Sequence, residues 1–171
     1  MKLYSGKVAA ISSEIVEVLT ESNAIEVLPD EIQEVELDIA SVLKEYIRLD
    51  KEITDRAKDL MAQKKLDYNQ LSKIKFQLAE ERAMGVGESV IEYLTSQIIE
   101  VLLHSRHVEE VYAEDHELSR QMSGVLKKHM SIEEELDLEV RKRIKNLQEG
   151  TSAYEIQYKK LLDELRKNKK L

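Results

Sequence analysis

The sequence has no cysteine and no tryptophan, and its 171 residues include only one proline, one phenylalanine and five glycines. The lack of cysteine excludes disulfides, thiol nucleophiles and thiolate metal sites. The scarcity of proline and glycine leaves few residues that interrupt helices. No run of the chain approaches the ~18 apolar residues of a membrane span. We therefore expect a cytoplasmic protein that makes no membrane contact.

Charged residues make up 35% of the chain and apolar residues 42%, a profile typical of soluble helical proteins. A chain of this length buries roughly 70% of its unfolded surface, which suffices for one domain or two small ones. The formal net charge is −8, and it is unevenly distributed. Residues 88–139 carry a net charge of −9, whereas residues 141–171 carry +6.

The two halves of the chain resemble each other when the sequence is shifted by 83 positions. Between residues 13 and 61, 13 of 49 positions are identical to their counterparts without a gap, and apolar positions agree more often than identities. The agreement continues through the non-helical stretch near Ile25 and Val108, which a shared helical period does not explain. We therefore predict a tandem duplication, with a first unit at 1–83, a glycine-containing joint at 84–87 and a second unit at 88–171.

The hydrophobic periodicity predicts an all-α fold with four helices in each unit and at most one short strand or extended segment. The first three helices of the first unit are expected at about 5–22, from near Asp30 to Ile47, and at 53–61, with a kink at residues 48–50 between the last two. The fourth begins at Asp67. Their counterparts are expected at about 88–103, 118–130, 132–147 and from Ser152 onward.

One short alternating segment lies between the first two predicted helices of each unit. If the units pack about a pseudo-twofold axis, residues 25–27 and 108–111 can pair as a two-stranded antiparallel ribbon. This pairing would satisfy backbone groups that an isolated short strand leaves open. The sequence thus predicts a ribbon between segments more than 80 residues apart.

Two charged positions recur at the same spacing: Lys44 and Glu52 in the first unit correspond to Lys127 and Glu135 in the second. One interpretation is an ion pair that fixes the corner between two helices, which would contribute under ~1 kcal/mol if exposed. The alternative is a polar docking surface that the protein presents twice. We treat these four residues as a candidate docking surface.

The last third of the chain is basic. Such a patch can contact phosphates, but it can equally neutralise the acidic part of its own unit, and cations are favoured near helix C-termini. Only Tyr154 and Tyr158 could stack on bases, but their helical spacing favours a place in the core over a role in base stacking. The candidate basic patch consists of Arg141, Lys142, Arg143, Lys145, Arg166 and Lys167.

The sequence offers no strong catalytic or metal-binding pattern. Glu100, His104 and His107 share one face of a predicted helix and could hold zinc or iron. The first unit has Glu21 and Ala24 at the two histidine positions, so we assign no metal, cofactor or catalytic residue. The Gly85–Gly87 pair lacks the third glycine of a dinucleotide-binding loop, which favours a hinge between units.

The opening residues 1–8, the block 35–48 and the stretch 133–144 carry a family resemblance, most specifically in residues 38–48. Here the chain resembles a bacterial family catalogued only as domain of unknown function 507, over nearly its whole length. The resemblance implies a bacterial, cytoplasmic protein. It supplies no activity, cofactor or catalytic residue.

These observations lead to the expectation of a non-catalytic adaptor or scaffold that binds another protein or a second copy of itself. Wide apolar helix faces and a repeated surface suit bivalent docking, in which two linked sites gain avidity. Two alternatives remain open. The protein could associate with nucleic acid or the ribosome through the basic last third, or it could be an enzyme with an unrecognised carboxylate site.

Overall fold

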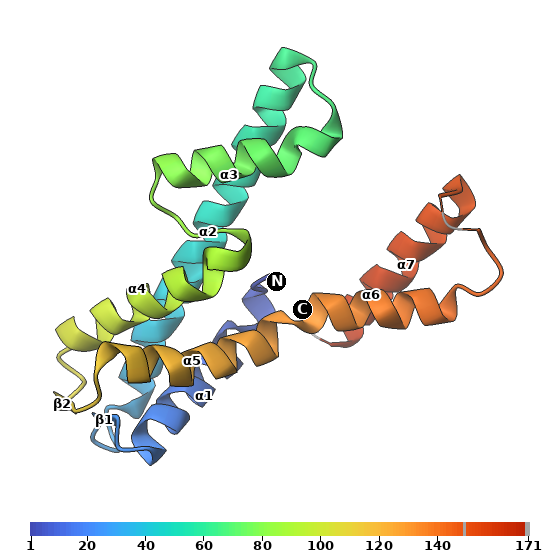
Figure 1. Cartoon of the computed structure of the whole chain (residues 1–171). Helices are drawn as coiled ribbons and strands as arrows, with labels where there is room; N and C mark the ends of the chain where they lie inside the picture. Colours follow the sequence, from blue (N-terminus) through green and yellow to red (C-terminus); the bar gives the residue numbers. More distant parts are fainter. Residues whose placement is uncertain (149, 170–171) are drawn as a thin grey trace.

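The computed structural model describes residues 1–148 and 150–169, and helices dominate it (Figure 1). Short 3-10 turns precede α1, α3 and α4. No helix among the described residues combines the length and the apolar character that crossing a bilayer requires. In chain order the elements are α1 (Val8–Glu21), β1 (Ile25–Glu26), α2 (Ile32–Lys64), α3 (Leu71–Glu81), α4 (Val90–His104), β2 (Glu110–Val111), α5 (Asp115–Met130), α6 (Ile132–Arg143) and α7 (Ser152–Asn168).

The two strands form an antiparallel ribbon, in which Ile25 lies opposite Val111 and Glu26 lies opposite Glu110. Next to this pair, the backbone N–H of Glu109 donates to the carbonyl of Glu26 at 2.9 Å. The ribbon joins two loops at one end of the molecule (Figure 1). The predicted pairing of these distant segments is confirmed, and the fold is mostly helical with this small sheet.

The body of the molecule consists of α1, residues 32–50 of α2, α4, α5 and the ribbon. Helix α1 packs against α2 and α5, and α4 packs against the same two helices. The main apolar core lies among these four helices because each turns its apolar stripe inward. Its largest fully buried side chains include Ile11, Ile15, Leu19, Ile39, Leu43, Leu94, Ile98, Leu102, Leu118, Met122 and Leu126.

Two helical hairpins project from the body in different directions (Figure 1). The first arm is the distal part of α2 (residues 51–64) with α3, and most of its buried residues, such as Ile53 and Leu78, belong to the main core. The second arm is α6 with α7, and it has a separate small core. The two arms are therefore attached differently, the first by a shared helix and core and the second by a joint at Ser131. The separate core consists of Leu136, Val140, Ile144, Tyr154 and Leu165.

The predicted kink at residues 48–50 is wrong, because α2 continues without a break from Ile32 to Lys64. No proline or glycine interrupts this stretch. Moreover, the Arg48 guanidinium contacts Glu45 at 2.7 Å and Glu52 at 3.0 Å, and pairs at these spacings support a helix. The chain does break at Ser131, between α5 and α6. The first 83 residues consequently contain α1–α3, rather than four helices.

Candidate functional site

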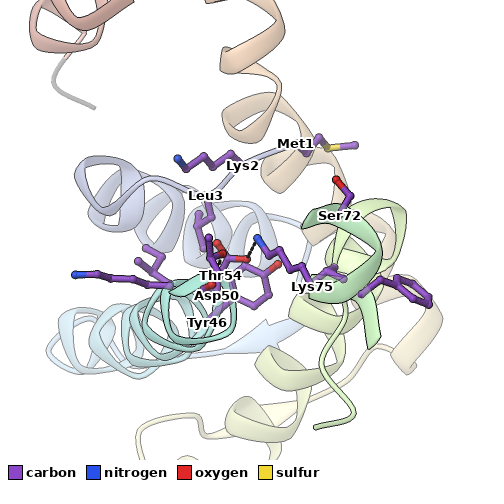
Figure 2. Close-up of a pocket in the computed structure, with 13 residues that line it drawn as sticks. Met1, Lys2, Leu3, Tyr46, Asp50, Thr54, Ser72 and Lys75 are labelled. Atoms are coloured by element: carbon purple, nitrogen blue, oxygen red, sulfur yellow. Dashed lines mark hydrogen bonds and ion pairs between the residues drawn. The ribbon is translucent and has the colours of Figure 1, made fainter. Parts of the chain in front are cut away.

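A cavity with a volume of about 640 Å³ lies at the base of the first arm. This size falls within the usual range for ligand-binding pockets, about 300–1,000 Å³. Four parts of the chain surround it: the N-terminal segment, the middle of α2, α3 and the link before α4 (Figure 2). We call it the arm-base cavity. Its lining comprises Met1, Lys2, Leu3, Tyr46, Ile47, Asp50, Lys51, Thr54, Ser72, Lys75, Phe76, Val86 and Gly87.

An ion pair crosses the arm-base cavity between α3 and α2. The Lys75 Nζ atom lies 2.7 Å from Asp50 Oδ1, and the two side chains are 27% and 29% exposed. Figure 2 shows Lys75 extending from α3 toward Asp50, with Met1 and Lys2 on another side of the cavity. Partial burial shields this pair from solvent screening, so it helps hold α3 against α2.

The floor of the cavity is closed by Tyr46, a buried residue of α2. Its hydroxyl donates to the Gly85 carbonyl at 3.2 Å, and its ring centroid lies 5.9 Å from that of Tyr93. Burial raises the pKa of the Tyr46 hydroxyl above its ordinary value, so it remains a protonated donor at neutral pH. This hydrogen bond fixes the link between α3 and α4.

Gly85 is required in that link by its close approach to α4. A Cβ atom at Gly85 would lie 2.5 Å from the Tyr93 Cβ and 2.6 Å from the Ser89 carbonyl oxygen. Such distances are too short for any real side chain, so only glycine lets the link pass here. The glycine pair that we interpreted as a hinge therefore includes one residue with a packing role.

The arm-base cavity combines apolar and charged side chains. Its floor combines the apolar groups of Leu3, Tyr46 and Ile47, and its charged groups include Lys51 at the rim. The Asp50 carboxylate is already compensated by Lys75. Such a surface can hold an apolar group and attract a negative charge next to it.

The four predicted docking residues are exposed, but the structure gives them different surroundings. Lys44 borders a groove of about 370 Å³ between α1 and α2. Glu52 contacts Arg82 at 2.7 Å, which links α2 to the end of α3, and it also accepts from Arg48. The Arg82 hydrogen bond is the main reason why the pKa of Glu52 lies below its usual range.

The interpretation of Lys44 and Glu52 as a corner ion pair is wrong. Both lie on the uninterrupted α2, and eight residues of helix separate them by about 12 Å along the axis. Their counterparts Lys127 and Glu135 lie on α5 and α6, on either side of Ser131. A docking role of these four exposed residues stays a prediction.

The predicted basic patch is partly neutralised by carboxylates of its own arm. Arg141 contacts Asp137 at 2.9 Å and Arg143 contacts Glu139 at 2.6 Å, each one turn away on α6. Arg166 is half-buried on α7 and lies over a tyrosine ring of the N-terminal segment, 5.6 Å from its centroid. The exposed members of the patch that make no ion pair with another described residue are Lys142, Lys145 and Lys167.

The two histidines of the considered metal site have separate partners. The His104 ring nitrogen lies 2.8 Å from the backbone oxygen of Glu100, whereas the His107 ring donates to the Glu31 carboxylate at the start of α2. Among the described residues, no group of three or more His, Cys, Asp or Glu side chains is placed to hold a metal ion.

Sequence reasoning missed the arm-base cavity. Asp50 and Lys75 are 25 positions apart on different helices, so no local spacing connects them. Only the prediction that two helices of one unit pack antiparallel could have placed them together.

Comparison with models of protein families gives a match over the whole chain. A family model described as "Protein of unknown function (DUF507)" matches residues 1–171. A search of curated proteins found no match.

Proposed function

Because the chain belongs to the DUF507 family over its full length, we propose on structural grounds that it is a non-catalytic adaptor that binds other proteins. The observation that carries this proposal is that two arms project from one body and that both arms expose large apolar side chains. The first arm exposes Tyr68 and Phe76, and the second exposes Leu138 and Ile156. Two linked surfaces of this kind suit bivalent binding, in which the second contact gains from effective concentration.

The displaced carboxyl pKa values also favour a binding role over an enzyme. Among the described residues, the carboxyls with a clear displacement are Glu14, Glu45, Glu52 and Asp137, and each pKa is lowered by a cationic or hydroxyl partner. A general acid at neutral pH needs a raised pKa instead. These four carboxylates also form ion pairs in the fold.

Part of the same proposal is that the protein arose by duplication of a helical unit. The six buried residues of α1 fall, 83 positions later, on six buried residues of α4. The two sets even include hydroxyl residues at the same place, Ser12 and Thr95, both of which are buried. Helix α2 then corresponds to α5 and α6 together, which explains why one arm continues a body helix and the other follows a break.

Site-specific photo-crosslinking tests the adaptor proposal in living cells. A photoreactive phenylalanine at Phe76 or Ile156 samples one arm each. The same group at Leu103, which is 52% exposed on the body helix α4, serves as the control. We expect each arm position, but not Leu103, to crosslink to a defined protein. A crosslinked second copy of this chain would identify the partner as self. No crosslink from either arm, or equal crosslinks from Leu103, would contradict the proposal.

Nucleic-acid binding is the second candidate function, and the exposed Lys142, Lys145 and Lys167 support it. Phosphate contacts make such binding fall steeply with salt. A labelled single-stranded RNA at ~50 mM salt tests this candidate, with Lys142→Glu together with Lys145→Glu as the variant. Failure to bind any nucleic acid under these conditions would remove it.

A further inference from the structure

The arm-base cavity carries positive charge on a strongly acidic molecule. Three lysines line it, Lys2, Lys51 and Lys75, against the single carboxylate of Asp50. In contrast, residues 8–43, which form α1, β1 and the first part of α2, contain nine acidic residues and no lysine or arginine. The cavity therefore carries a net positive charge, whereas this neighbouring part of the chain is negatively charged.

The lysines of the cavity differ in how far they are already engaged. Lys75 is paired with Asp50, and the Lys2 ammonium lies 5.2 Å from the centroid of the Tyr4 ring. Lys51 makes no ion pair with any described residue. A carboxylate at the rim would therefore meet Lys51 directly without displacing an existing ion pair.

The apolar surface extends from inside the cavity onto its rim. Leu3 and Tyr46 are buried at the floor, while Phe76 is 50% exposed and Met1 is 55% exposed at the mouth. A small molecule lodged inside would leave these two rim side chains in water. A polypeptide that inserts one side chain and continues across the rim would cover them as well.

We propose that the arm-base cavity is the docking site for a segment of a partner protein that carries a large apolar side chain flanked by carboxylates. The inference rests on the proposed adaptor function and names the chemistry of its partner. The apolar side chain fills the cavity over Tyr46, and the flanking carboxylates lie near Lys51. A segment with basic flanks is repelled by the same lysines, so charge provides specificity.

A hexapeptide with a central Leu-Phe pair and two acidic residues on each side is a suitable probe. It is titrated into the full-length, ¹⁵N-labelled protein and followed by amide chemical shifts. We expect saturable shifts at Tyr46, Asp50 and Lys75, and a Kd at least about tenfold lower than for the same peptide with lysine flanks. A third peptide with Ser-Ser at the centre measures the part of binding that comes from charge alone.

Two tryptophan variants then locate the binding site. Ser72→Trp places a bulky group at the mouth of the cavity, on an exposed position of α3. Ser13→Trp makes the same change at an exposed position of α1 that does not line the cavity. We expect Ser72→Trp to raise the Kd of the acidic peptide at least about tenfold, and Ser13→Trp to leave it unchanged.

Three results would each overturn the inference. They are no saturable shift at about 2 mM acidic peptide, equal affinity for the acidic and basic peptides, and an unchanged Kd in Ser72→Trp. The adaptor proposal fails separately, when neither arm gives a crosslink. A protein crosslinked from Phe76 together with a silent peptide titration would leave the adaptor standing and remove only the acidic, apolar chemistry assigned to its partner.

Discussion

Removal of one buried leucine from the second arm should destabilise that arm and leave the body unaffected. Leu136 is fully buried in α6, and its neighbours are the few residues of the arm's own small core. Leu136→Ala deletes buried methyl groups and leaves a cavity, a change that costs about 3 kcal/mol in a packed core. This loss corresponds to a rise of roughly 150-fold in the local opening equilibrium of the arm.

Hydrogen–deuterium exchange read by mass spectrometry measures this opening helix by helix. In Leu136→Ala we expect amides of α6 and α7 to exchange about 100-fold faster, with amides of α1–α5 unchanged. The matched variant is Leu126→Ala, because Leu126 is equally buried but belongs to the main core. That variant should lower the free energy of global unfolding in urea by a similar amount.

The physical reason for this separation is that the two cores share no buried residue among those the structure describes. The second arm is linked to the body by the joint near Ser131 and by the contact of Arg166 with the Tyr4 ring. Equal acceleration of exchange in α1–α5 and in α6–α7 of Leu136→Ala would refute the reasoning. Body and second arm would then unfold as one cooperative unit despite their separate cores.

Three further predictions concern single side chains. Hydrogen bonds from a lysine and a histidine of α5 hold the pKa of Glu14 below 4.5. The Glu14 carboxylate therefore stabilises the folded state above pH 4.5, and this contribution is lost as the pH falls through the folded-state pKa. The Tm advantage of the wild type over Glu14→Gln should shrink over that range. The hydrogen bond to Asp137 raises the pKa of Tyr158 to about 12, and Asp137→Asn should return it toward 10 in an ultraviolet titration of tyrosinate. Gly85→Ala should destabilise by about 1–3 kcal/mol through the contact with α4, whereas Gly124→Ala, in an open position of α5, should stabilise by about 0.5–1 kcal/mol in urea unfolding.

Local sequence patterns predicted much of the secondary structure. The apolar spacing located α1, α4 and α5 because each turns one continuous stripe to a core. The ribbon could be predicted because a short alternating segment follows the first predicted helix in each half of the sequence, and two such segments can satisfy each other's backbone groups.

The prediction failed where tertiary contacts decide the outcome. Residues 48–50 have a pattern compatible with either a kink or a continuous helix, and the contacts of Arg48 and Arg82 with Glu52 favour continuity. The sequence did not predict the arm-base cavity either, because the cavity depends on how α3 folds back onto α2. No spacing along the chain encodes the distance between Asp50 and Lys75.

The unbroken course of α2 has a mechanical consequence. Its 33 residues span about 50 Å, from beside the ribbon, through the body, to the tip of the first arm (Figure 1). A force applied at that tip is transmitted along a single stiff rod to the opposite end of the molecule. A force on the second arm is instead absorbed first by the bend at Ser131. The first arm is therefore rigidly continuous with the body, whereas the second arm is attached to the body through a bend.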